Sequence, residues 1–117
     1  MMFIVASSVS AQTETNTNID QGLHGKVSWY GEKYHGRKMA NGKRFNMYTF
    51  TCAATSEYAL GEKLKVTNVD NGKSVIVTVT DRGPFARRGR ALDLSFAAFK
   101  EIASTKKGVI NTTIERL

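Results

Sequence analysis

Alternation of apolar and polar residues is clearest between positions 75 and 80 of the chain. Three valines fall on one face of this segment, and isoleucine and threonine fall on the other. A period of two with β-branched residues predicts a β-strand. The strand runs into the sequence DRGP at 81–84, which holds the only proline of the chain and predicts a turn. A basic loop and a second short strand at 91–94 follow.

Similar patterns predict four further strands, at 26–30, 48–54, 63–68 and 109–116. The sequence DNG at 70–72 predicts a hairpin turn. Ser95 is a candidate N-cap for a helix that ends before Gly108, because Phe96, Phe99 and Ile102 follow at helical spacing. Residues 32–42, with two glycines and an Asn-Gly pair, predict a long functional loop.

Many short strands and one helix, without an internal repeat, predict a mainly β fold, a small closed barrel with one packed α-helix. The chain has 117 residues and 41% hydrophobic residues, enough for one domain, which we place at residues 25–117. Residues 1–11 contain an apolar run and end in Val-Ser-Ala, which predicts a signal peptide. The polar segment 12–24 predicts a disordered linker.

The net charge of +7 is concentrated in the predicted domain. All 17 Lys and Arg residues lie from Lys26 onward, whereas two of the 10 acidic residues precede it, so the domain carries +9. This charge favours an anionic partner such as nucleic acid, acidic lipid or a wall polymer, although scattered surface charge also serves solubility. Cys52 is the only cysteine and the two histidines lack metal-ligand spacing, so we predict no disulfide, no metal and no other cofactor.

Seven short motifs occur together and in order: GKVSWYG at 25–31, HGR at 35–37, MANG at 39–42, VTN at 66–68, NG at 71–72, DRGPF at 81–85 and LDLS at 92–95. On these motifs the chain resembles the RlpA-like (rare lipoprotein A) double-psi β-barrel domain family, which is related to expansins. The resemblance covers about residues 25–117 and implies a six-stranded double-psi barrel.

The resemblance implies a periplasmic or secreted septal or endolytic lytic transglycosylase. Its substrate would be peptidoglycan glycan strands without stem peptides, and its products would carry anhydro-muramic ends. The chain departs from the usual pattern at three positions: Lys43 stands for Glu, Asn46 for Asp, and Thr55 near the usual His. These departures favour the alternative, a non-catalytic expansin-like module that binds glycan and loosens the wall. The first residues contain no cysteine for a lipid anchor, no segment is long enough to span a membrane, and we expect a monomer without nucleic acid.

Asp81 and Asp93 are the candidate catalytic residues. A lytic transglycosylase can use one carboxyl group as acid and then as base, and Asp81 belongs to the retained DRG motif. Asp93 lies between two leucines, so if these enter the core it faces outward with Asp81. The alternatives are that Asp81 only caps the turn and that Asp93 pairs with Arg90.

Six further residues are candidates for binding glycan: Tyr30, His35, Asn41, Arg82, Arg87 and Arg88. Tyr30 and its neighbour Trp29 face opposite sides of a strand, and we assign Tyr30 to the groove, where it can stack on a sugar ring. The arginines can bind lactyl carboxylates exposed by removal of stem peptides. The arginines and His35 also have alternatives without a ligand: a solvated basic loop for the arginines and a structural role for His35.

Overall fold

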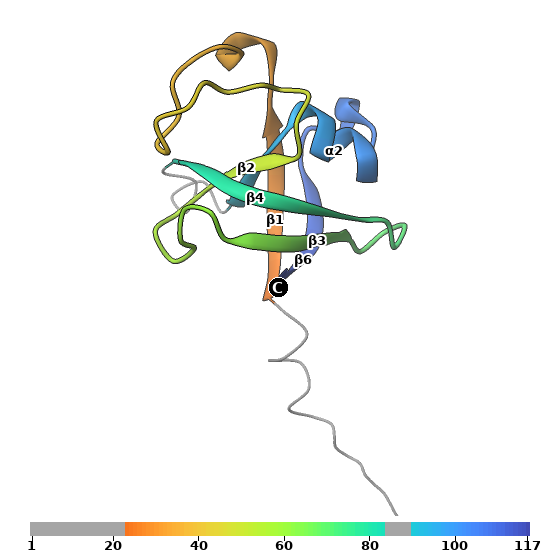
Figure 1. Cartoon of the computed structure of the whole chain (residues 1–117). Helices are drawn as coiled ribbons and strands as arrows, with labels where there is room; N and C mark the ends of the chain where they lie inside the picture. Colours follow the sequence, from red (N-terminus) through yellow and green to blue (C-terminus); the bar gives the residue numbers. More distant parts are fainter. Residues whose placement is uncertain (1–22, 84–89) are drawn as a thin grey trace, which may run out of the picture.

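The computed structural model describes residues 23–83 and 90–117 of the chain. Six strands dominate these residues: β1 (Leu23–Tyr30), β2 (Thr51–Ala54), β3 (Lys63–Asn68), β4 (Ser74–Arg82), β5 (Arg90–Ser95) and β6 (Ile110–Arg116). One α-helix, α2 (Phe96–Ile102), follows β5, and two short 3-10 helices occur at η1 (Glu32–Tyr34) and η3 (Thr105–Lys107). Figure 1 shows the strands crossing beneath a long loop that connects β1 to β2.

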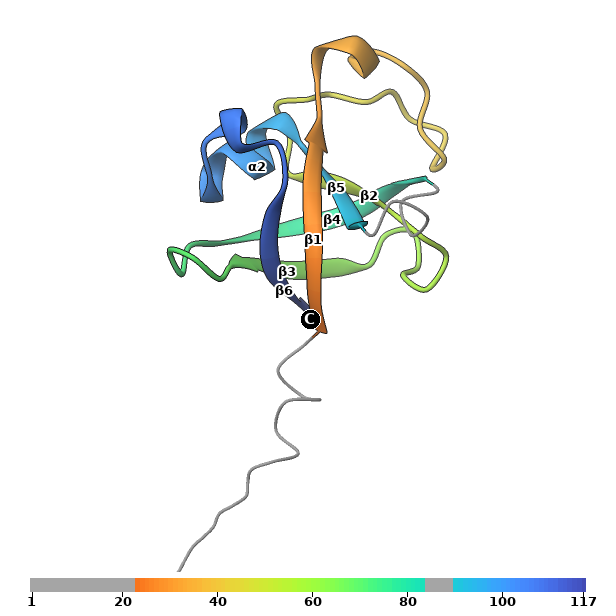
Figure 2. The ribbon, with the colours of Figure 1, turned by 180° about the vertical axis from the view of Figure 1, so that it is seen from behind.

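The strands close into a barrel in the order β1-β5-β2-β4-β3-β6. The β1–β5 and β2–β4 pairs are parallel, and the other four pairs are antiparallel. Figure 2 shows β1, β5 and β6 together from behind, although β1 comes from the other end of the described chain. Closure leaves no unpaired edge in the sheet. The predicted six-stranded barrel with one packed helix is therefore confirmed.

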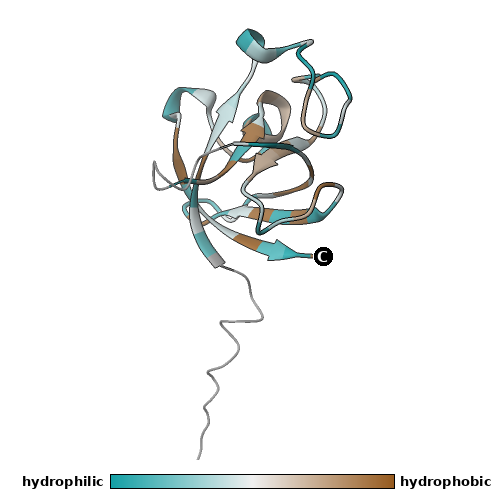
Figure 3. Ribbon diagram, turned by 90° about the vertical axis from the view of Figure 1, so that its left-hand side faces the viewer, coloured by the Kyte–Doolittle hydropathy of each residue, from teal (hydrophilic) through white to brown (hydrophobic). Residues whose placement is uncertain are grey.

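The core lies inside the barrel and under α2. Alternate residues of the strands supply it, and the valines predicted on one face of β4 are 0–6% exposed. Figure 3 shows the same alternation as brown positions along the strands, whereas the upper loop is largely hydrophilic. Phe99 and Ile102 of α2 are fully buried against this core.

Ser95 caps α2 as predicted, because its side-chain oxygen accepts a hydrogen bond from the Ala98 amide at 3.2 Å. Its hydroxyl also donates to the Thr49 carbonyl at 2.5 Å. The helix ends at Ile102, before Gly108 as predicted, and a separate 3-10 turn lies between the two. In residues 23–83 and 90–117, no helix has the length and hydropathy of a membrane span.

Element boundaries differ from the sequence prediction by two or more residues at three places. β1 begins at Leu23, two residues before the predicted domain start, because β6 pairs with Leu23 and His24. β2 begins at Thr51 rather than at residue 48. β4 extends through Arg82, so Asp81 lies in a strand and not in the predicted turn. Residues 1–22 lie outside the described part, and with them the predicted signal peptide and most of the linker.

Cys52 is fully buried in the core, and burial raises the pKa of its thiol to about 12. Because the thiolate is the nucleophile that attacks alkylating reagents, we expect Cys52 in the folded protein to resist alkylation at pH 8. It should react within minutes once the protein is unfolded in denaturant. Mass spectrometry after iodoacetamide treatment measures both states, and rapid labelling of the folded protein would contradict the burial.

Candidate functional site

Asp81 and Asp93 lie in one row across the sheet. Asp93 of β5 pairs with Ala53 of β2, and Ala53 pairs in turn with Asp81 of β4. The two aspartates are thus two strand spacings apart, about 10 Å between Cα atoms. Both line a pocket of about 250 Å³ whose wall between them is Ala53. A small residue at this central position keeps the space between the two carboxylates open.

A β-bulge brings Asp81 to the outer face of the sheet. Val79 points into the core, so strict alternation would turn Asp81 inward as well. The β2–β4 register skips Thr80: Cys52 pairs with Val79, and Ala53 pairs with Asp81. The extra residue reverses the facing of Asp81, which is the usual effect of a bulge.

Backbone amides fix the Asp81 carboxylate. Its Oδ1 atom accepts hydrogen bonds from the amides of Ala40 and Arg82, each at 2.9 Å. Ala40 belongs to the loop above the barrel, so Asp81 also ties this loop to β4. Among the described residues, no hydrogen bond reaches Oδ2, and Asp81 is half-buried at the pocket. One carboxylate oxygen is therefore held in place while the other is left for a ligand.

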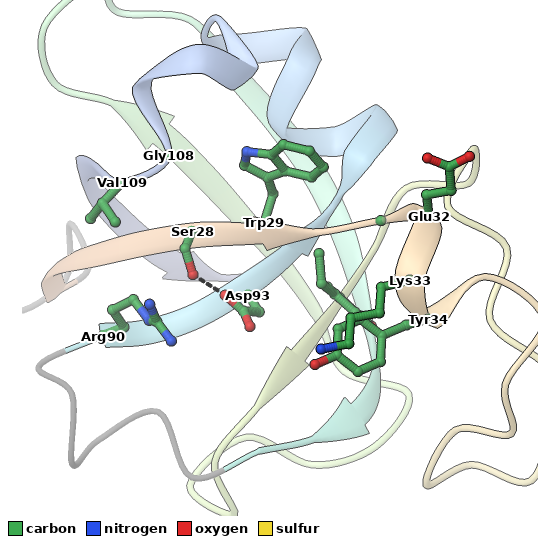
Figure 4. A pocket seen from close by; sticks show the side chains of 11 residues that line it. Ser28, Trp29, Glu32, Lys33, Tyr34, Arg90, Asp93, Gly108 and Val109 are labelled. Atoms are coloured by element: carbon green, nitrogen blue, oxygen red, sulfur yellow. Dashed lines mark hydrogen bonds between the residues drawn. The ribbon is translucent and has the colours of Figure 1, made fainter.

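Asp93 is held by a side chain from the neighbouring strand. Ser28 of β1 is in register with Asp93, and its hydroxyl donates to Asp93 Oδ1. Figure 4 shows this contact inside a second pocket of about 600 Å³, where Arg90 extends from the same strand as Asp93. The predicted alternative, an ion pair between Asp93 and Arg90, does not occur in the described part of the chain. The two pockets share Tyr30, Tyr34 and Asp93, so they are continuous.

Tyr30 lines both pockets, but its ring is already packed against other aromatic rings. The ring stacks on Phe45 with centroids 4.3 Å apart and contacts Tyr34 edge-on at 5.8 Å. Its buried hydroxyl has no hydrogen-bond partner in the described residues. Burial raises the pKa of Tyr30, and the charges of Asp81, Cys52 and Asp93 raise it further. The hydroxyl therefore stays protonated beside the carboxylates and can donate a hydrogen bond to a ligand. The ring, which already packs on Phe45 and Tyr34, is less suited to stacking on a sugar.

For the glycan ligand that the family resemblance implies, replacing Tyr30 with phenylalanine should weaken binding by roughly 3–10-fold, the effect of one lost hydrogen bond to a sugar. Stability should not fall, because the hydroxyl has no partner in the folded protein and the Phe45 stacking is kept. Binding titrations with glycan and thermal unfolding measure the two effects. A drop in melting temperature without a change in affinity would show that the hydroxyl serves folding instead.

The loop between β1 and β2 forms one side of the site. Met39, Phe45 and Met47 are buried in a small second cluster, with Tyr30 and Phe96 packed against it. Backbone hydrogen bonds pair the two arms of the loop, including Phe45 N to Arg37 O at 2.7 Å. The loop is therefore packed in place beside Asp81, and the functional role of residues 32–42 stays a prediction.

The other predicted binding residues do not share one location. Arg82 turns its guanidinium away from Asp81, because Nη1 donates to the carbonyls of Thr55 and Tyr58. His35 Nδ1 accepts from the Met47 amide at 3.2 Å and lines none of the pockets described here, so its observed role is to hold the loop. Asn41 lines a third pocket, beyond Asp81. Arg87 and Arg88 lie outside the described residues.

Sequence reasoning missed Ser28, Ala53 and Tyr34 as parts of the site. Ser28 and Ala53 are there because β1 and β2 both neighbour β5, a pairing between distant segments. Tyr34 is there because the 3-10 turn after β1 brings it over Tyr30. The GKVSWYG motif was the one available signal for Ser28, since it falls in that motif.

Comparison with known proteins gives matches over nearly all of the described chain. The model of the lytic transglycolase family matches residues 23–114. The endolytic peptidoglycan transglycosylase RlpA of Vibrio cholerae is 48% identical over 91 residues, which cover 78% of this chain and 34% of the relative. The protein of the same name from Pseudomonas aeruginosa is 47% identical over 91 residues, 78% of this chain and 26% of the relative. The chain thus spans about a third or less of the length of these two relatives.

Among solved structures, the apo form of the expansin from Clavibacter michiganensis matches with a TM-score of 0.62 and 27% sequence identity. The match covers 80% of this chain and 49% of the expansin chain. This chain therefore shares its barrel architecture with the expansin, whose chain is longer.

Proposed function

We propose that this chain, which belongs to the RlpA-like lytic transglycolase family of double-psi β-barrel domains, cleaves peptidoglycan glycan strands and leaves anhydro-muramic ends. The pocket between Asp81 and Asp93 is the observation that carries this proposal. It offers two carboxylates on one open face, each held through one oxygen among the described residues. The names of these relatives supply the reaction class.

The reaction needs one carboxyl group in two successive roles. Protonated Asp81 gives its proton to the glycosidic oxygen as the bond from C1 of the muramic residue breaks. The resulting carboxylate takes the proton from the C6 hydroxyl of the same sugar, and O6 bonds to C1. The anhydro ring closes, the neighbouring sugar leaves with a free hydroxyl, and Asp81 recovers its proton. No water enters the product.

Asp93 and Tyr30 act on the sugar beside the broken bond. Positive charge develops at the anomeric centre in the transition state of glycoside cleavage. The Asp93 carboxylate stabilises this charge from the other side of the pocket. Ser28 fixes the orientation of that carboxylate. The Tyr30 hydroxyl donates to a sugar oxygen. We further propose that the substrate lacks stem peptides and that the protein acts outside the cytoplasm as a monomer.

The test is the chemistry of the product. Purified protein is incubated with peptide-free glycan in isotopically labelled water, and the fragments are analysed by mass spectrometry. A lytic transglycosylase gives fragments one water lighter than hydrolysis products, without label at the new end. Labelled reducing ends would identify a hydrolase, and absence of any fragment would refute cleavage of this substrate.

The second candidate function is binding without cleavage, as in the expansin-like alternative. Lys43 and Asn46 favour it, because both line the pocket beyond Asp81 where the family pattern has acids. Sedimentation of the protein with insoluble glycan, combined with the same product analysis, separates the two functions. Tight binding with no fragments would select the binding module.

A further inference from the structure

A third pocket of about 560 Å³ lies immediately beyond Asp81, on the side of the loop above the barrel. Thr80, the residue before Asp81, lines it. Asn41 also lines it and follows Ala40, whose amide holds the Asp81 carboxylate. The Asn41 amide donates to the Thr80 carbonyl at 3.2 Å, so the loop and β4 meet at the border of the two pockets.

The charge of this pocket is opposite to that of its neighbour. Lys43 and Arg44 line it, and no acidic side chain appears in its described lining. Lys63 adds a third cation at the wall, because its Nζ donates to Thr78 Oγ1 at 3.2 Å. Arg44 Nη1 donates a hydrogen bond to the Gly36 carbonyl at 3.0 Å, and the other guanidinium N–H groups remain available as donors. The surface therefore changes from acidic at Asp93 and Asp81 to basic here.

Neutral hydrogen-bonding groups complete the pocket. Thr51 Oγ1 is buried and has no partner among the described residues. The Asn46 side chain uses its oxygen on the Tyr48 amide at 2.9 Å, which leaves its NH₂ group as a donor. Cations and neutral donors without a carboxylate form an environment that favours an anion.

The backbone under Lys43 is held in a tight turn. Its carbonyl accepts from the Met39 amide at 2.7 Å, and its amide donates to Asn41 Oδ1 at 2.9 Å. Gly42 supplies the positive φ of 87° that this turn requires. The turn presents Lys43 at a fixed place at the pocket, although its side chain is exposed to solvent.

We propose that this basic pocket binds an anionic substituent, carboxylate or phosphate, of the glycan next to the cleaved bond, with Lys43 as the main specificity determinant. The proposal rests on the proposed function, because a glycan lying across Asp81 and Asp93 must continue past one of them. Lys43 acts on affinity and on the choice of substrate, not on the proton transfers.

Binding is measured with the full chain carrying Asp81→Asn, so that the glycan is not cut. Three glycans are compared: peptide-free glycan, the same glycan with its carboxyl groups reduced to alcohols, and the same glycan treated with hydrofluoric acid to remove phosphate-linked polymers. We expect the affinity to fall about 3–10-fold for the glycan that has lost the recognised anion. A fall after carboxyl reduction identifies a carboxylate, and a fall after hydrofluoric acid identifies a phosphate. Lys43→Gln should abolish this preference, and Lys43→Glu should reverse it.

Lys73→Glu is the matched control, because it changes the net charge equally on an exposed hairpin residue that lines none of the three pockets. It should keep the preference for the anionic glycan. Equal affinity of the Asp81→Asn protein for all three glycans, or equal effects of Lys43→Glu and Lys73→Glu, would overturn the anion site. Failure of the wild-type protein to cut glycan refutes the proposed reaction and leaves this binding comparison valid.

Discussion

Replacing Asp81 with asparagine is expected to lower the rate of glycan cleavage by about 10²–10⁴-fold, the usual contribution of a general acid and base. Asparagine keeps a carbonyl oxygen where Asp81 Oδ1 accepts the amides of Ala40 and Arg82. The loop should therefore stay attached to β4, and glycan affinity and melting temperature should change little. Release of anhydro ends from peptide-free glycan measures the loss.

Asp93→Asn is the matched comparison, since it removes a carboxylate from the opposite side of the same pocket. Ser28 can still donate to the amide oxygen, so the row of residues across the sheet should be preserved. We expect a smaller loss of rate than for Asp81→Asn. If Asp93→Asn abolished cleavage while Asp81→Asn kept most of it, the two aspartates would have to exchange roles.

Phe99→Ala is expected to destabilise the fold by about 3–5 kcal/mol. Phe99 is fully buried where α2 lies on the barrel, and its ring is 6.4 Å from that of Trp29. Domains of this size have a free energy of unfolding of about 5–15 kcal/mol, so this single cavity removes a large part of it. Thermal and denaturant unfolding give the change directly.

Phe50→Ala is the control for this effect, because it deletes the same ring from a side chain that is 45% exposed. Its cost should stay below about 1 kcal/mol. Similar losses for the two variants would mean that Phe99 does not anchor α2 to the barrel.

Local pattern was enough to predict elements whose partners are close in sequence. β3 was predicted with its observed limits, since Lys63–Asn68 alternates cleanly and pairs through a short turn with β4. The turn itself contains Gly72 at a φ of 75°, the conformation for which the Asn-Gly pair is suited. The Ser95 cap was likewise visible, because its partner Ala98 is three residues away.

The site depended on pairings that local pattern does not reveal. Alternation along β4 gave no warning of the bulge at Thr80, which arises where β4 runs parallel to β2. Arg82 was expected to bind the ligand, yet its guanidinium donates hydrogen bonds to the carbonyls of Thr55 and Tyr58. The family resemblance, confirmed by the match over residues 23–114, supplied the double-psi barrel that periodicity alone left open. The assignments of Asp81 and Asp93 stay predictions until the variants are measured.

The neighbours of β1 set a condition on when this protein can fold. β1 lies between β5 and β6, which are the last two strands that the structure describes, so neither partner exists until most of the barrel has been synthesised. An emerging chain therefore cannot close the barrel before β5 and β6 have been made, and the pairing of β1 with strands so distant in sequence slows folding.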